Sequence, residues 1–139
     1  MLRYTLTHPG IIGALAAAGH GSQILVMDGN YPHSTGSNPA AELVHLNLRA
    51  GFPLVTDVLE TLLTAIPVEA ASVMGPDEGG DPPLLGEFAT LLGPEIPVSR
   101  LARQDFYAAG RGRDVALAIA TGEQRWYANL LLTIGALAG

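Results

Sequence analysis

Histidine, carboxylate and arginine side chains occupy a few positions of this 139-residue chain where a small ligand has room to reach them. His20 stands between Gly19 and Gly21, directly after an apolar segment. Free imidazole has a pKa of about 6.5 and can give and take a proton at neutral pH, so His20 is a candidate general acid/base. The position also suits a helix C-cap, in which the imidazole bonds the last helical carbonyls. Both interpretations stay open from position alone.

A carboxylate stands at the end of a second apolar segment. Asp28 follows the run Gln23–Met27 and begins a loop, a place where carboxylates of α/β proteins often meet ligands. The alternative is an Asx turn, in which Asp28 accepts hydrogen bonds from its own loop backbone, and for the residue alone this is the better interpretation. Asn30 and His33 belong to the same loop and could line the same pocket or remain solvated.

Three further side chains are suited to holding a hydroxyl-rich ligand. Arg103 could clamp such a ligand, or it could form a surface ion pair with an acidic neighbour. Tyr127 and Asn129 are two residues apart, so they point the same way if the chain is extended there. The alternative is that Trp126 packs in the core and Asn129 serves a turn. No motif for a nucleophilic serine accompanies these residues.

The composition excludes several kinds of chemistry. Cysteine is absent, and all seven basic residues are arginine, so thiolate, Schiff-base and P-loop lysine chemistry are excluded. The histidines at positions 8, 20, 33 and 45 lack the spacing of metal ligands, and the glycines near His20 do not form a dinucleotide fingerprint. We therefore expect no metal and no cofactor. A net charge of −6 argues against nucleic acid as a partner.

These side chains must be positioned by an alternation of helices and strands. Apolar spacing and capping residues predict helices over residues 9–18, 55–63, 84–92 and 103–109. Strands are predicted over residues 23–27, 44–48, 68–74 and 115–120, and a last apolar stretch begins at Asn129. This order indicates one domain over residues 1–139, a three-layer α/β/α fold with a central, largely parallel, mixed sheet. In such sheets ligands bind at loops beyond the strand ends.

The chain is unusually poor in charge. Charged residues make up 14% of it, against about 25% in an ordinary soluble domain, and the mean hydropathy is +0.30. The longest apolar run, Leu130–Ala138, is about half the length that a membrane-spanning helix needs, and we see no secretory signal. We therefore expect a cytoplasmic homo-oligomer without membrane contact, whose subunit contacts cover much of the surface.

Taken together, the motifs resemble the RbsD/FucU family of sugar mutarotases and pyranases. The resemblance runs from about Pro9 to the C-terminus and rests on an ordered set of weak motifs: Ala18-Gly19-His20-Gly21, Asp28, Pro32, Arg103 with Phe106-Tyr107, Thr121-Gly122-Glu123 and Tyr127-Ala128-Asn129. Arginine before Phe-Tyr is typical of the fucose branch, whereas the ribose branch has histidine there. The segment that follows Asp28 also resembles the fucose branch, although Gly29 and Asn30 depart from its usual alanine and histidine.

The resemblance implies an isomerase that opens and recloses the ring of a free monosaccharide, L-fucose or a related sugar. His20 would be the catalytic acid/base, with Tyr127 or a water as its partner. Asp28, Arg103, Tyr127 and Asn129 would bind the sugar. The resemblance also implies a ring-like decamer. The alternatives are D-ribose pyranase activity, a non-catalytic sugar-binding or transport-accessory oligomer, or a purely structural oligomer.

Overall fold

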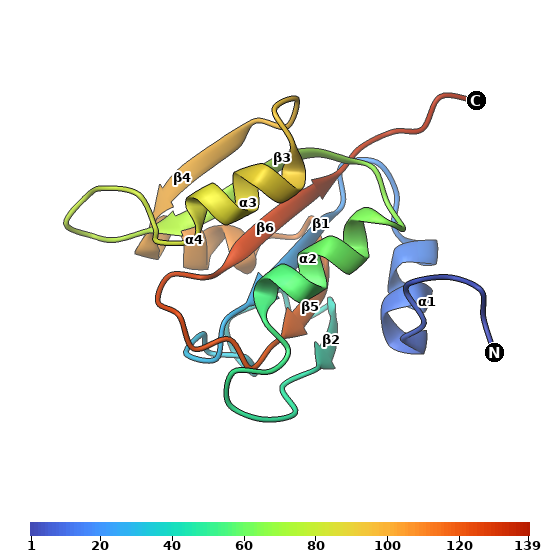
Figure 1. Cartoon of the computed structure of the whole chain (residues 1–139), viewed down its shortest axis with the longest axis horizontal. Coiled ribbons are helices and arrows are strands. Elements are labelled where there is room, and N and C mark those ends of the chain that lie inside the picture. Colours follow the sequence, from blue (N-terminus) through green and yellow to red (C-terminus); the bar gives the residue numbers. More distant parts are fainter.

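The computed structural model describes residues 1–139 as one mixed sheet with helices on both faces (Figure 1). In chain order the elements are α1 (Pro9–Ala17), β1 (Gln23–Met27), β2 (Glu42–His45), α2 (Val55–Leu63), β3 (Val68–Gly75), α3 (Leu85–Leu92), β4 (Val98–Ala102), α4 (Arg103–Gly110), β5 (Val115–Ala120) and β6 (Leu130–Ile134). The α/β prediction is confirmed.

The six strands lie in the order β2-β5-β1-β6-β3-β4. Strand β6 is antiparallel to its neighbours β1 and β3, whereas the pairs β1–β5, β2–β5 and β3–β4 are parallel. Five strands therefore run in one direction and β6 runs back between them (Figure 1). Because of this topology, the five parallel strands end, and β6 begins, at the same end of the sheet.

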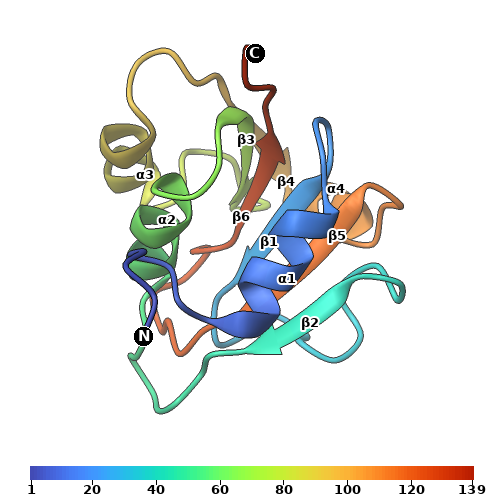
Figure 2. The same cartoon turned by 90° about the vertical axis from the view of Figure 1, so that its right-hand side faces the viewer.

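The two faces of the sheet carry separate apolar cores. Residues of α1, α2 and α3 pack on one face in a cluster of 20 buried residues that includes Ile24, Leu59 and Phe88. On the other face, α4 and the loop after β1 build a cluster of 9 buried residues around Phe106 and Tyr31. Figure 2 shows α4 on the side of the sheet opposite to α2 and α3. The predicted three layers are thus present, with a thinner layer on the α4 side.

Strand β4 was not among the predicted elements. It lies at the edge of the sheet, and three of its five residues are exposed, so it lacks the apolar run that marks a buried strand. The predicted strand over residues 44–48 is also shifted, because β2 ends at His45 and the Leu48 side chain is 76% exposed.

Helix α1 ends at Ala17, one residue before the predicted bound. Ala18 caps it in an extended conformation, and Gly21 adopts a positive φ of 84°. None of the helices has the length and apolarity required to cross a membrane.

Candidate active site

A cavity of about 310 Å³ opens at the end of the sheet where the parallel strands end. The end of β1, the end of β3, the first residue of α4 and the segment before β6 all contribute to its lining. The lining residues are Asp28, Asn30, Met74, Arg103, Trp126, Tyr127 and Asn129. The chain therefore brings together four of the five predicted site residues, which come from segments as far apart in sequence as residue 28 and residue 129.

The carboxylate of Asp28 is the hydrogen-bonding centre of this cavity. It is only 3% exposed, and its Oδ1 accepts from the backbone N–H groups of Asn30 at 3.0 Å and Tyr31 at 2.9 Å. Its Oδ2 accepts from the Ala128 N–H at 3.2 Å and from the Asn129 side-chain amide at 3.0 Å. The Asx turn is therefore present, and the same carboxylate also lines the cavity.

Burial raises the pKa of Asp28 above its usual value, and the four N–H donors offset part of that effect. A carboxylate offers about four acceptor positions, and here each is matched by a donor. Asp28 therefore joins the β1 end to the segment before β6 and fixes one wall of the cavity.

The amide of Asn129 completes this junction. Its Oδ1 accepts from the Asp28 backbone N–H at 2.7 Å, and its Nδ2 also lies 3.8 Å from the Met74 sulfur of β3. These contacts fix which end of the amide faces which partner. Asn129 therefore lines the cavity and bonds to the end of β1, and it lies outside the turn at residues 126 and 127.

Tyr127 has an uncommon backbone. With a φ of 56° it is the only non-glycine residue of the chain in the left-handed region. The chain is therefore not extended at Tyr127, so the condition under which the two side chains would point the same way is not met, yet both line the same cavity. A left-handed residue of this kind is held by its surroundings, here by the bonds that Asp28 makes to the next two residues.

Arg103 begins α4 and contacts an acidic loop. Its Nη2 lies 2.8 Å from Oδ2 of Asp77, and both side chains are about half exposed. The ion-pair alternative for Arg103 is thus observed, and the arginine lines the cavity as well. Asp77 was not among the predicted site residues; the acidic, glycine- and proline-rich loop around it was the only signal in the sequence.

Trp126 does not pack in the core. Its side chain is 72% exposed, and its ring lies edge-on to Tyr127 with 6.5 Å between the ring centroids. An exposed indole at the rim of a polar cavity offers an apolar face to a ligand.

His20 lies at the opposite end of the sheet, shortly before β1 begins. The neighbouring Gly21 N–H donates to the Ile134 carbonyl at the far end of β6. The imidazole Nε2–H donates to Oε2 of Glu69 at 2.8 Å, so the side chain does not cap α1. The five residues of β1, at about 3.3 Å each, separate His20 from Asp28 by roughly 16 Å along the sheet. Within one chain, His20 is not part of the cavity.

His33 supports the Asp28 loop from outside. Its Nε2–H donates to the Asp28 carbonyl at 2.6 Å, and its ring lines a second, polar cavity of about 370 Å³ together with Asn47 and Arg49. Asn30 lines both cavities. The two cavities therefore adjoin at the loop after β1.

The Thr121-Gly122-Glu123 motif fixes the start of the connection between β5 and β6. A side chain at Gly122 would collide with the carbonyls of Arg49 and Phe52, so the close approach requires glycine. The buried Glu123 carboxylate accepts from Arg125 Nη2 at 2.8 Å and from the Val55 N–H at 3.3 Å. This connection leads directly into Trp126 and Tyr127.

Two opposing effects act on Glu123. Burial alone would raise the pKa of its carboxyl, but the hydrogen bonds and charge of Arg125 outweigh burial and hold that pKa below its usual value. The same pairing raises the pKa of Arg125. Arg125 also contacts Glu87 of α3 at 3.2 Å, so the connection is tied to the helical layer.

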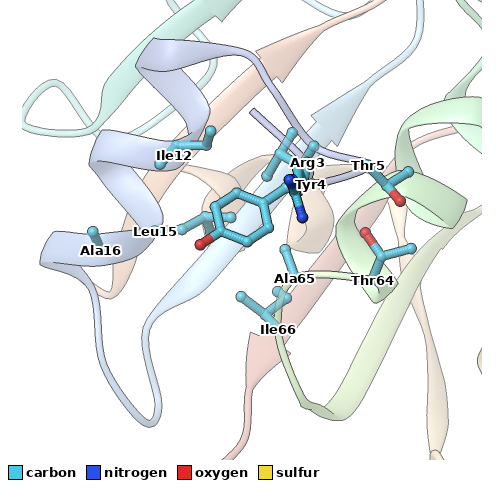
Figure 3. Close-up of a pocket in the computed structure, with 10 residues that line it drawn as sticks. Arg3, Tyr4, Thr5, Ile12, Leu15, Ala16, Thr64, Ala65 and Ile66 are labelled. Atoms are coloured by element: carbon cyan, nitrogen blue, oxygen red, sulfur yellow. The ribbon is translucent and has the colours of Figure 1, made fainter. Parts of the chain in front are cut away.

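A larger cavity of about 610 Å³ lies away from these groups. It is enclosed by residues 3–6, α1 and the segment after α2, and its lining is mostly apolar (Figure 3). None of the predicted site residues lines it. The structure also contains no group of three or more His, Asp or Glu side chains that could hold a metal ion.

Residues 1–137 match the RbsD / FucU transport protein family, so the chain belongs to the RbsD/FucU family. D-ribose pyranase 2 of Streptomyces griseus is 34% identical over 90% of each chain. D-ribose pyranase of Symbiobacterium thermophilum is 32% identical over 97% of this chain and 98% of its own. Human fucose mutarotase is 29% identical over 96% of this chain and 91% of its own. The predicted family and the predicted enzyme class, a sugar isomerase, are confirmed at the level of the family.

Solved structures show the same fold. RbsD of Bacillus subtilis in complex with D-ribose superposes with a TM-score of 0.80 at 25% identity, over 99% of this chain and 100% of that one. Fucose mutarotase of Streptococcus pneumoniae in complex with L-fucose gives a TM-score of 0.78 at 21% identity over 99% and 100%. The three-layer architecture is therefore that of the RbsD/FucU fold.

Proposed function

We propose that this chain is a mutarotase that opens and recloses the hemiacetal ring of a free monosaccharide. The observation that carries the proposal is the meeting of Asp28, Arg103, Tyr127 and Asn129 around one cavity beside an exposed indole. Such a cavity offers hydrogen-bonding groups for hydroxyls and an aromatic face for the apolar side of a sugar. Its relatives include D-ribose pyranases and fucose mutarotases.

The reaction needs two proton movements and no net change in protonation. One group removes the proton of the anomeric hydroxyl while another protonates the ring oxygen, and the ring carbon–oxygen bond breaks. Reclosure on the other carbonyl face reverses both transfers. Arg103 and the Tyr127 hydroxyl hold sugar hydroxyls, Trp126 stacks on the ring, and Asp28 with Asn129 sets the wall against which the sugar lies.

The acid/base group we assign is His20, acting with Tyr127 or through a water. Since His20 lies about 16 Å along the sheet from Asp28, it serves the cavity of a second copy of the chain. This assignment requires the homo-oligomer expected from the low charge of the chain, and a ring-like decamer is the form that we propose.

For the sugar we propose L-fucose, because arginine at position 103 is the feature of the fucose branch. D-ribose is the second candidate, since relatives named D-ribose pyranase reach 34% identity and human fucose mutarotase 29%. Exchange rates measured with both sugars decide between them.

A non-catalytic sugar-binding role is the second candidate function. The matching family is described as a transport protein family, and no histidine is among the groups that line the cavity of one chain. A binding protein would take up the sugar and leave its exchange rate unchanged.

The test is saturation-transfer NMR on fucose and ribose at anomeric equilibrium. We expect exchange about 10²- to 10⁴-fold faster than in buffer, the range of general acid/base catalysis. His20→Ala should abolish the acceleration and leave the fold intact. The matched control is His45→Ala, because His45 is also exposed and its side chain makes no hydrogen bond. Retained activity in His20→Ala would remove His20 from this role.

A further inference from the structure

The loop between β3 and α3 is hydrogen-bonded to β4 and ion-paired with Arg103, the cavity arginine at the start of α4. Arg100 of β4 donates from Nη2 to the Pro76 carbonyl at 2.7 Å and from Nε to the Gly80 carbonyl. These bonds fix both arms of a turn closed by the Gly79 N–H and the Pro76 carbonyl at 3.1 Å. Asp77 stands in this turn and reaches Arg103 at 2.8 Å. The position of Asp77 is therefore set by the backbone around it.

We propose that Asp77 is a specificity-determining residue, which orients Arg103 and compensates its charge so that the cavity selects uncharged sugar hydroxyls over anionic substituents. The inference rests on the proposed function in one respect, that Arg103 contacts the sugar.

The charges around the cavity support this role. Arg103 is the only cationic residue that lines the cavity, and the other charged lining residue is Asp28. Asp77 adds a second carboxylate beside the guanidinium. A phosphate or carboxylate on the ligand would therefore compete with Asp77 for Arg103 while lying near Asp28. A neutral hydroxyl meets no such competition.

The geometry of guanidinium allows both contacts at once. Arg103 carries five N–H donors in a fixed fork, and Asp77 occupies the Nη2 end. The remaining N–H groups stay available to donate to a hydroxyl oxygen in a defined direction. Without Asp77, Arg103 would be a mobile cation with all five donors open to an anion.

The experiment compares Asp77→Asn with the wild-type protein in binding titrations against D-ribose, L-fucose, D-ribose 5-phosphate and L-fucose 1-phosphate. The control is Glu78→Gln, which removes one negative charge from the same loop but forms no ion pair with Arg103. Asp77→Glu restores the carboxylate one methylene further out and tests rescue. Saturation-transfer NMR on the neutral sugars gives kcat and KM for the same proteins.

In Asp77→Asn we expect affinity for the phosphate esters to rise about three- to tenfold, a gain that shrinks with added salt. The KM for the neutral sugar should rise with little change in kcat, because orientation of Arg103 is lost and the proton-transfer groups are untouched. Asp77→Glu should return the neutral-over-anionic preference toward the wild-type value.

Unchanged preference in Asp77→Asn, or an equal gain in Glu78→Gln, would overturn the role of Asp77. Failure of the proposed function is a different result, since the wild-type protein would then leave the exchange rate of the neutral sugars unchanged, whether or not it binds them.

Discussion

Asp28 shows how one buried carboxylate can determine the geometry of a whole site. It is 3% exposed and accepts four hydrogen bonds, two from its own loop and two from residues 128 and 129. Each donor needs a lone pair, so a side chain with an amide in place of one oxygen cannot satisfy them all. Two of these bonds hold the residues that directly follow Tyr127.

Asp28→Asn should lower the free energy of unfolding by about 1–3 kcal/mol, the usual effect of leaving buried donors without acceptors. It should also slow sugar exchange, because the wall formed with Asn129 is disturbed. Urea unfolding measures the first effect. Asp114→Asn, an exposed aspartate without side-chain hydrogen bonds, is the control and should stay within about 0.5 kcal/mol of the wild type. Equal stabilities for both variants would contradict the role assigned to Asp28.

The left-handed backbone of Tyr127 gives a second test at the residue scale. At a φ of 56°, alanine keeps the unfavourable conformation and glycine does not, so Tyr127→Gly should be more stable than Tyr127→Ala by about 1–2 kcal/mol. Both variants should lose sugar exchange because both lack the phenol. The comparison uses urea unfolding, and a more stable alanine variant would mean that the left-handed turn is not maintained.

The element that matters most for the site is the connection between β5 and β6. Glu123 joins it to the start of α2 through the Val55 N–H, and Arg125 joins it to α3 through Glu87. Thr121 donates its hydroxyl to the Met27 carbonyl at 2.7 Å, next to Asp28. The connection is thus attached to the sheet and to the helical layer, and these attachments position Tyr127 at the cavity.

Glu123 contributes to the pH dependence of stability. Its folded pKa lies below the ordinary value of 4.5, so between the two values the unfolded chain binds the extra proton. The contribution of Glu123 is present above pH 4.5 and is lost as the pH falls through the folded pKa. Glu123→Gln should lower the free energy of unfolding at neutral pH by about 1–3 kcal/mol. The loss is limited because Arg125 is 38% exposed and keeps its ion pair with Glu87. The variant should also show a smaller decrease in the free energy of unfolding at acidic pH, because it lacks the titrating carboxyl. Urea unfolding from pH 3 to pH 7 measures this, and an unchanged acid slope would contradict it.

Elements with a strong apolar pattern could be predicted, and edge elements could not. Strand β1 and helix α2 have the bounds expected from their buried residues. Strand β4 was not predicted, because an exposed edge strand lacks the run of apolar residues that marks a buried strand. The Arg103–Asp77 pair joins a helix start to a distant loop, and nothing local in either segment indicates the other. The positive φ of Tyr127 could not be predicted either, because a tyrosine rarely adopts this conformation without tertiary contacts.

At the scale of the whole molecule, a single chain separates His20, the acid/base that we propose, from the cavity that we propose binds the sugar. The cavity lies where β1 ends, whereas His20 lies where β1 begins. Exposed Leu48, Phe52 and Trp126 side chains leave apolar surface available for contact with further copies. An assembly in which His20 of one subunit faces the cavity of the next would account for the low charge and for the divided site.

Mixing of inactive variants tests the divided site. His20→Ala and Tyr127→Phe should each lose sugar exchange while remaining oligomeric. After joint unfolding and refolding, mixed assemblies contain some sites with an intact His20 from one subunit and an intact Tyr127 from its neighbour, so part of the activity should return. The assembly mass is checked by light scattering. A monomeric wild-type protein, or no recovery in a verified mixed oligomer, would contradict the division.

The central claim is that this chain accelerates ring opening and reclosure of a free sugar, and saturation-transfer NMR on fucose and ribose tests it most directly. We predict that the wild-type protein accelerates exchange of at least one of the two sugars about 10²- to 10⁴-fold over buffer and that His20→Ala does not. An exchange rate equal to that in buffer for both sugars, at protein concentrations where binding is saturated, would contradict the claim.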